Sequence, residues 1–267
     1  MSRVLKLILY YFIYQLVCTF VLTFLFYVPT VIRQTIESGT LSFPPFAANS
    51  EITVTLYALI ASNLLFGWHL IHYKYASINR NTLAFVSGEL YLPLTLLTLS
   101  LMCSLNYLTE IIRLPDLNQS LFLEMKDSIP GIISIAVIAP AFEELFFRGA
   151  IEKHLLQKWD KPAYAILVSA LIFGLIHGNP AQIPYAFILG LLLGWFYFRT
   201  GSLIPCIVIH FINNALSVTL MITLPEKAES MNRLFGETLA PKIAIAGVII
   251  AICCFYYIHK LLKNHPR

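Results

Sequence analysis

Long apolar runs separated by short polar stretches make up most of this chain. Eight such runs are predicted as helices, since a bilayer-spanning helix needs about 20 mostly apolar residues. They lie at 4–28, 52–73, 82–105, 131–151, 163–177, 182–197, 203–224 and 243–262. The fifth and sixth are short for a span, so we expect them to be tilted or partly buried inside the bundle. The pattern predicts an all-α fold, a polytopic membrane helix bundle with about eight transmembrane helices.

The composition agrees with a membrane protein and excludes several other classes. Hydrophobic residues make up 58% of the chain and charged residues 12%, whereas a soluble domain carries roughly 45–50% apolar and about 25% charged residues. A disordered chain, a nucleic-acid-binding module and an ordinary cytosolic enzyme are therefore excluded. The net charge of +4 is too small to favour nucleic acid as a partner. No internal repeat is visible, so residues 1–267 are expected to form one integral-membrane domain in contact with membrane lipids.

The charges in the connections predict the orientation of the bundle. With the N-terminus inside, the inner segments hold eleven basic residues: Arg3, Lys6, Lys74, Arg80, Lys153, Lys158, Lys161, Arg199, Lys260, Lys263 and Arg267. They hold two acids, Glu152 and Asp160. The outer segments hold six basic residues, Arg33, Arg113, Lys126, Lys227, Arg233 and Lys242, and nine acids, Glu37, Glu51, Glu110, Asp116, Glu124, Asp127, Glu226, Glu229 and Glu237. Because cytoplasmic segments are enriched in Lys and Arg, both termini are expected in the cytoplasm.

Charged residues also lie inside predicted helices. Such a residue costs about 2.5–3.5 kcal/mol at membrane depth, so Glu89, Glu143, Glu144 and Arg148 need a structural or functional reason. The adjacent Glu143 and Glu144 point about 100° apart on a helix. Glu144 and Arg148 are spaced i, i+4 and are expected to pair. Glu143 is left without a local cation and suits a general base. The alternative is a buried ion-pair network that ties helices together.

Two further helices place polar residues on one face. The fifth ends Phe173-Gly-Leu-Ile-His177, and the seventh contains His210-Phe-Ile-Asn213-Asn214, in which His210 and Asn214 are one turn apart. Taken singly, each pattern is better explained by structural hydrogen bonds between helices. Three polar faces in one bundle favour convergence on a shared site, because polar groups in lipid need partners or water.

The converged residues suit two kinds of chemistry. A carboxylate, two imidazoles and an amide can activate water and stabilise an oxyanion, as peptide hydrolysis requires. The set Glu143, His177 and His210 also suits a divalent metal such as zinc, and the residues alone leave both alternatives open. The motifs H-E-x-x-H and G-x-S-x-G are absent, and no Asp lies in a predicted span. These absences exclude zincin, serine-elbow and intramembrane aspartyl arrangements.

The motifs Glu-Glu-x-x-x-Arg, Phe-x-x-x-His and His-x-x-x-Asn follow one another at 143–148, 173–177 and 210–214. This ordered set resembles the type II CAAX prenyl protease family, also called the CAAX protease and bacteriocin-processing or Abi family. The resemblance covers about residues 140–216 and implies an eight-helix intramembrane endopeptidase with its catalytic core at about 131–224. It implies hydrolysis of a peptide bond in a membrane-associated substrate, in CAAX-type or bacteriocin-related processing.

The resemblance also implies a catalytic set: Glu143, Glu144, Arg148, His177, His210 and Asn214. Glu143 with His177 would activate the attacking water, and His210 with Asn214 would stabilise the oxyanion. Glu144 and Arg148 would support the site. Members of the family have been described both as metalloproteases and as metal-independent, glutamate-based enzymes. Because no H-E-x-x-H motif or comparable ligand cluster is present, we favour the second description and predict no cofactor, with zinc at Glu143, His177 and His210 as the alternative.

Two other functions are alternatives to proteolysis. One is a non-catalytic membrane binding or immunity protein of the same fold, which would tolerate Glu143→Gln. The other is a transporter that uses the buried Glu and His residues as a proton relay. A transporter of this kind typically shows two related halves with interrupted helices, and the sequence shows neither.

The orientation can be measured directly. A reporter fused after Arg267 should be scored as cytoplasmic, because the basic residues predominate in the segments on the side of the termini. A fusion after residue 116, in an outer segment, serves as the control and should be scored as external. An external signal from the C-terminal fusion would reverse the predicted orientation.

Overall fold

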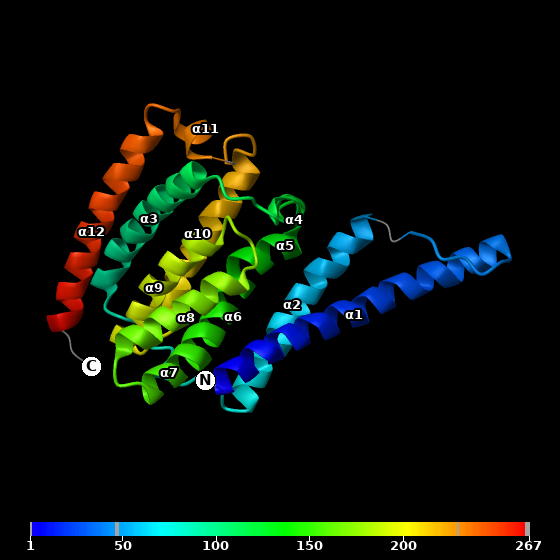
Figure 1. Ribbon diagram of the computed structural model, residues 1–267, viewed down its shortest axis with the longest axis horizontal. Helices are drawn as coiled ribbons and strands as arrows, with labels where there is room; N and C mark the ends of the chain where they lie inside the picture. The colour runs from blue at the N-terminus through cyan, green and yellow to red at the C-terminus, as the bar shows by residue number, and fades with distance from the viewer. Residues whose placement is uncertain (1, 46–47, 229, 265–267) are drawn as a thin grey trace.

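The computed structural model describes residues 2–45, 48–228 and 230–264, and this part of the chain contains helices, turns and loops without a strand (Figure 1). Seven of its helices are long and apolar enough to cross a membrane. They are α1 (Ser2–Ser38), α2 (Ala48–His72), α3 (Tyr91–Ile112), the composite segment Ile129–Lys158, α9 (Ile183–Thr200), α10 (Ile204–Thr223) and α12 (Ala240–Asn264). The predicted fifth run forms a shorter apolar helix, α8 (Pro162–Ile176). The predicted all-α membrane bundle is confirmed.

The segment predicted as the fourth helix is built from five pieces. These are α5 (Ile129–Ile133), η2 (Ser134–Ile138), α6 (Ala139–Phe146), η3 (Phe147–Glu152) and α7 (Lys153–Lys158). Both η2 and η3 are π-helical, a geometry that is rare and recurs at functional sites. Pro140, in the first turn of α6, has no N–H to donate into the preceding turn, which helps to explain why the helix widens there. The segment that carries Glu143, Glu144 and Arg148 is therefore not a regular α-helix.

The prediction for the start of the third helix is wrong. Residues 82–87 form a loop, and the helical segment begins only at η1 (Gly88–Leu90), immediately before α3. Thr82 holds the loop in place, because its hydroxyl donates to the Ser77 carbonyl at 2.9 Å. Its carbonyl oxygen accepts from the Leu203 N–H at 2.8 Å. Glu89 consequently lies in the first turn of this helical segment and not two turns inside a helix.

The placement of Glu152 also differs from the prediction, which ended the fourth helix at residue 151. The helix continues to Lys158, because π-helical η3 leads directly into α7. Glu152, assigned from the sequence to an inner connection, has only 1% of its surface exposed. The first helix also extends ten residues beyond its predicted end at residue 28, to Ser38. Two short helices in the connections were not predicted, α4 (Gln119–Met125) and α11 (Met231–Phe235).

Six of the helices pack as three pairs. Helices α1 and α2 lie side by side, as do α8 and α9, and α3 lies beside α12 although they are far apart in the sequence (Figure 1). The last pair is held closely, because the Ser104 hydroxyl donates to the Ala244 carbonyl at 2.9 Å. A Cβ on Gly247 would stand 2.7 Å from the Ser100 carbonyl oxygen, so this contact needs glycine. Helix α2 packs on α6, while most of α1 is exposed.

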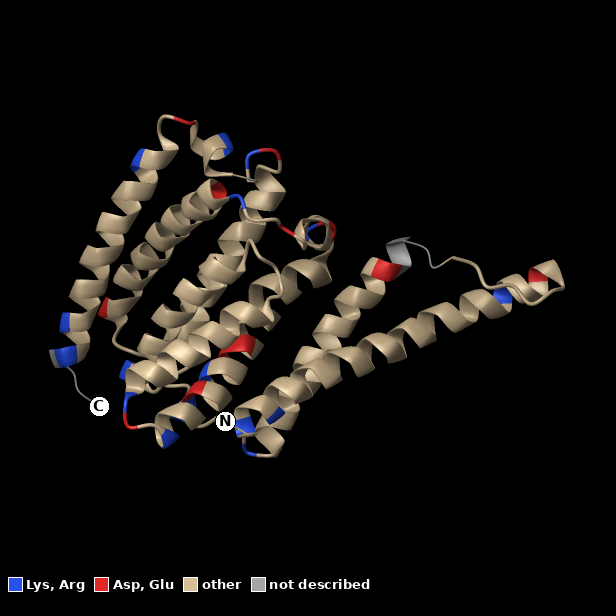
Figure 2. Ribbon diagram, in the orientation of Figure 1, with Lys and Arg blue, Asp and Glu red and all other residues tan. Residues whose placement is uncertain are grey.

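The described ends of the chain, at Ser2 and Asn264, lie at the same end of the bundle (Figure 1). Figure 2 shows that Lys and Arg predominate at this end, whereas acidic and basic residues mix at the opposite end. Arg267 and Glu229, which enter the charge count made from the sequence, lie outside the described residues. The spatial separation of charge follows the count from which the cytoplasmic orientation is predicted.

Candidate active site

The candidate site is centred on an ion pair between Glu144 in α6 and Arg148 in η3. Arg148 Nη1 donates to Glu144 Oε1 at 3.0 Å, and both side chains are fully buried. The pair predicted from the i, i+4 spacing is thus present. His210 Nδ1, from α10, donates to the same oxygen at 2.8 Å. One carboxylate oxygen therefore joins two helices and satisfies two donors.

The Arg148 guanidinium also contacts the two helices on its other side. Its Nη2 donates to the Gly190 carbonyl of α9 at 3.2 Å. Its Cζ lies 4.6 Å from the centre of the Phe173 ring of α8, a favourable cation–π distance. The close approach of α8 and α9 depends on Gly190, since a Cβ there would stand 3.1 Å from the Phe173 ring and 3.2 Å from Ala170. Arg148 consequently fixes the relative positions of η3, α8, α9 and, through Glu144, α10.

Glu143 and His210 face each other across the centre of the site. His210 Nε2 lies 3.7 Å from Glu143 Oε2, a distance beyond a direct hydrogen bond. Nδ1 of the same ring donates to Glu144, and this hydrogen bond orients the ring so that its Nε2 atom faces Glu143. The side chain of Glu143 is 23% exposed, whereas that of Glu144 is fully buried. Of the two adjacent carboxylates, Glu143 is the one with exposed side-chain surface, although its Oε2 atom, which faces His210, is buried and has no hydrogen-bond partner among the described residues.

His177 occupies the C-terminal end of α8, on the far side of Phe173. Its Nδ1 donates to the Phe173 carbonyl at 2.7 Å, which leaves Nε2 for another partner. The Phe173 ring meets both imidazoles edge to face, at 5.0 Å for His177 and 5.8 Å for His210. Within the described residues, Glu143 and His177 share no hydrogen bond or ion pair, and Glu143 is instead brought close to His210. The proposed pairing of Glu143 with His177 stays a prediction.

Asn214 lies next to the first π-helical segment. Its Nδ2 donates to the Ile135 carbonyl of η2 at 2.9 Å, and its Oδ1 accepts from Asn213 Nδ2 at 3.1 Å. The Oδ1 atom of Asn213 in turn accepts from the Tyr185 hydroxyl. One of the two amide hydrogens of Asn214 is therefore already used, and the other can serve a ligand. Asn213 and Tyr185 were not assigned to the site from the sequence.

The loop that follows His177 is held by a residue that the sequence analysis missed. Asn179 is fully buried. Its Nδ2 donates to Asp116 Oδ1 at 2.8 Å, and its Oδ1 accepts from the Leu117 N–H at 3.0 Å. Gly178 reaches this turn with a φ of 61°, in the left-handed region that glycine tolerates. The signal in the sequence was the Gly-Asn-Pro turn directly after α8. By fixing the C-terminal end of α8, this turn orients His177.

The alternative metal site requires Glu143, His177 and His210 to gather around one point. In residues 2–45, 48–228 and 230–264, no three His, Cys, Asp or Glu side chains form a group suited to a metal ion. The Nδ1 atoms of His177 and His210 donate to Phe173 and Glu144, so only their Nε2 atoms could bind a metal. As the side chains of the described residues lie, Glu143, His177 and His210 are not gathered into a zinc site, and no step of the chemistry below is routed through a metal.

Fold and site together define a polytopic membrane protein with a buried carboxylate–imidazole site. Residues 126–216 match the family model described as type II CAAX prenyl endopeptidase Rce1-like. This match confirms the resemblance carried by the three motifs. It spans α5 to α9 and α10 as far as Leu216, including all six site residues expected from the motifs, and leaves α1 to α4, the end of α10, α11 and α12 outside. Comparisons with curated proteins and with solved structures gave no match.

The central ion pair predicts the behaviour of an Arg148→Ala variant. Removing one partner of a buried pair costs about 3–5 kcal/mol, because the other charge stays buried and uncompensated. We therefore expect a lower yield of folded protein and a lower unfolding temperature, measured by size-exclusion chromatography and thermal unfolding in detergent.

The matched control is Arg33→Ala, which breaks an i, i+4 pair with Glu37 whose side chains are 80% and 61% exposed. This variant should behave as the wild type, because exposed pairs contribute little. An Arg148→Ala protein with wild-type yield and unfolding temperature would show that the pair does not contribute to the stability of the fold.

Proposed function

We propose that this protein is an intramembrane endopeptidase that hydrolyses a peptide bond of a membrane-associated substrate with a water molecule activated by Glu143. The observation that carries the proposal is the opposition of a partly exposed carboxylate and a fixed imidazole. Glu143 Oε2 lies 3.7 Å from His210 Nε2, beside a fully buried pair that holds the ring. The two atoms are too close for a water between them, but a water beside them can hydrogen-bond to both groups. The match of the site-bearing segment to a protease family model supports the reaction class.

The two adjacent carboxylates are suited to different tasks. Glu144 Oε1 accepts from Arg148 and His210, so Glu144 holds the site in place. Glu143 has no such partner among the described residues and is the general base, which takes a proton from the attacking water. His177 is the second imidazole of the proposed set and offers Nε2, since its Nδ1 is used by Phe173.

The proposed reaction balances without a cofactor. The water oxygen attacks the carbonyl carbon of the substrate, and its proton passes to Glu143. The resulting oxyanion is stabilised by a hydrogen bond from the second amide hydrogen of Asn214 and by one from His210 Nε2, which donates when the ring carries a proton on both nitrogens, since Nδ1 donates to Glu144. The C–N bond then breaks, the nitrogen takes the proton from Glu143, and the products are a carboxylic acid and an amine. The substrate is expected to come from CAAX-type or bacteriocin-related processing, as in the family that the motifs resemble.

A Glu143→Gln variant tests the proposed base. An amide cannot accept the proton of water, so the rate of cleavage should fall by about 10²–10⁴. The measurement is a quantitative comparison of membrane proteins and their new termini between cells with wild-type and variant protein, in which uncleaved precursors should accumulate.

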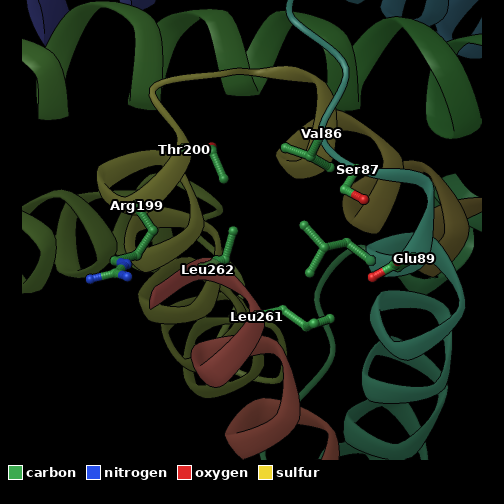
Figure 3. Close-up of a pocket in the computed structure, with 8 residues that line it drawn as sticks. Val86, Ser87, Glu89, Arg199, Thr200, Leu261 and Leu262 are labelled. Carbon is green, nitrogen blue, oxygen red and sulfur yellow. The ribbon is translucent and has the colours of Figure 1, made fainter. Parts of the chain in front are cut away.

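The matched control is Glu89→Gln. Glu89 lines a separate pocket of about 160 Å³ between η1 and the ends of α9 and α12, together with Ser87 and Leu262 (Figure 3). This variant should process the same precursors at the wild-type rate. Identical membrane proteomes for wild type and Glu143→Gln would reject proteolysis and favour the non-catalytic binding protein.

The metal-independent mechanism predicts resistance to chelation. Purified protein treated with a strong chelator and then freed of it should keep its cleavage rate on a precursor identified as above, since no step needs a Lewis acid. Loss of activity that zinc alone restores would overturn this part of the proposal and leave the peptidase reaction intact.

A further inference from the structure

Helix α1 lies outside the matched segment, yet one of its residues packs beside Glu143. The Tyr11 ring stacks on Phe146 with a centroid distance of 5.5 Å and an interplanar angle of 22°. It also stacks on Phe142 at 6.2 Å and 15°. Phe142 directly precedes Glu143, and Phe146 follows it after three residues. The aromatic contact therefore holds Tyr11 against the part of α6 that presents Glu143.

The hydroxyl group of Tyr11 has a free hydrogen. Its oxygen accepts a hydrogen bond from Gln15 Nε2 at 2.7 Å, one turn further along α1. In the described part of the chain, the O–H has no acceptor of its own. Gln15 thus holds the phenol oxygen, and the hydroxyl hydrogen remains available to a ligand.

This polar pair lies in the part of α1, residues 7–32, that contains no charged residue. In α1 the buried residues are Val4, Leu7 and Cys18, and most of the helix surface is exposed, as suits a lipid-facing helix. A phenol and an amide side chain at membrane depth cost free energy unless their polar atoms form hydrogen bonds with the protein or with a ligand. Gln15 donates to the phenol oxygen but does not accept the phenol hydrogen, so this hydrogen can be donated to a ligand.

We infer that Tyr11 is a further substrate-positioning residue, which donates its O–H to a backbone carbonyl of the substrate segment held against Glu143. The inference rests on the proposed function. A peptide must be extended or unwound around the scissile bond, and its freed carbonyls need donors in a low-dielectric site. Glu143 and Glu144 are acceptors, and Arg148 is fully buried, so none of the three supplies a donor to such a peptide. The Tyr11 phenol fits this need.

The test compares Tyr11→Phe with Tyr14→Phe, which lies one turn further on the same helix. Tyr11→Phe keeps the ring stacking and removes only the donor. The Tyr14 hydroxyl instead hydrogen-bonds His69 Nδ1 at 3.0 Å, so its loss affects the contact between α1 and α2. Cleavage rates are measured for purified proteins in lipid vesicles, with a precursor that accumulates in cells carrying Glu143→Gln.

We expect Tyr11→Phe to lower kcat/KM by about 5- to 10-fold, chiefly through KM, because a neutral hydrogen bond to the substrate is lost. Its unfolding temperature should match that of the wild type. Tyr14→Phe should keep the wild-type kcat/KM. An unchanged kcat/KM in Tyr11→Phe overturns the inference, and so does an equal loss in both variants accompanied by lower unfolding temperatures, since that indicates a purely structural role.

The Glu143→Gln variant separates failure of the inference from failure of the proposed function. If Glu143→Gln is inactive while Tyr11→Phe is fully active, the peptidase proposal stands and the role of Tyr11 is rejected. If Glu143→Gln cleaves as the wild type does, or if no precursor accumulates in cells carrying it, the proposed function fails and the role of Tyr11 fails with it.

Discussion

The arrangement of the site depends on one buried cation. Arg148 has no contact with water, so its charge must be balanced inside the bundle, and its guanidinium has donors on several sides. It uses them on Glu144 within its own helical segment and on the Gly190 carbonyl of α9, while its flat face lies on Phe173 of α8. The charge of Arg148 thus determines where α8 and α9 stand relative to the segment that carries the carboxylates.

The orientation of the imidazole follows from the same cation. Because Arg148 compensates Glu144, that carboxylate can accept from His210 Nδ1 deep in the bundle without leaving a net buried charge. The ring then has one orientation, with Nε2 toward Glu143. The π-helical segments on either side of α6 widen the helix next to these residues, and in η2 the Ile135 carbonyl is available to Asn214. Structural polar contacts and candidate catalytic groups are therefore parts of one network.

The spacing of residues in the sequence was sufficient to predict some of the contacts in this network. The i, i+4 relation of Glu144 and Arg148 lies within one helical segment, so their pairing could be predicted without knowledge of the fold. The contact of His210 with both glutamates joins α10 to α6, and no pattern in a single helix says which face meets which neighbour. The apolar run in the chain located the third helix but not its start, since Thr82 is removed from the helix by contacts with Ser77 and Leu203.

Residues outside the three motifs were the hardest to assign. Asn179 acts through a turn that binds the distant Asp116, and such a contact is invisible to spacing arguments. Tyr11 lies in a helix whose composition indicates only a membrane anchor, and its position against Phe146 is set by tertiary packing. Glu152 was assigned to a connection because the predicted helix ended at residue 151, whereas continuation of the helix through η3 buries it. In each case a contact between elements overrides a local rule.

The pairing of α3 with α12 has a consequence for the order in which the bundle assembles. Helix α12 follows every other helix described here, so its contact with α3 closes a long stretch of chain and forms late in membrane insertion. The segment with the candidate site, α5 to α10, lies entirely within that stretch and is synthesised before α12 is available. Until then, the Ser100 and Ser104 face of α3 lacks the helix that packs on it at Gly247. If the helices insert in the order of synthesis, α12 completes the bundle last, against a helix inserted much earlier.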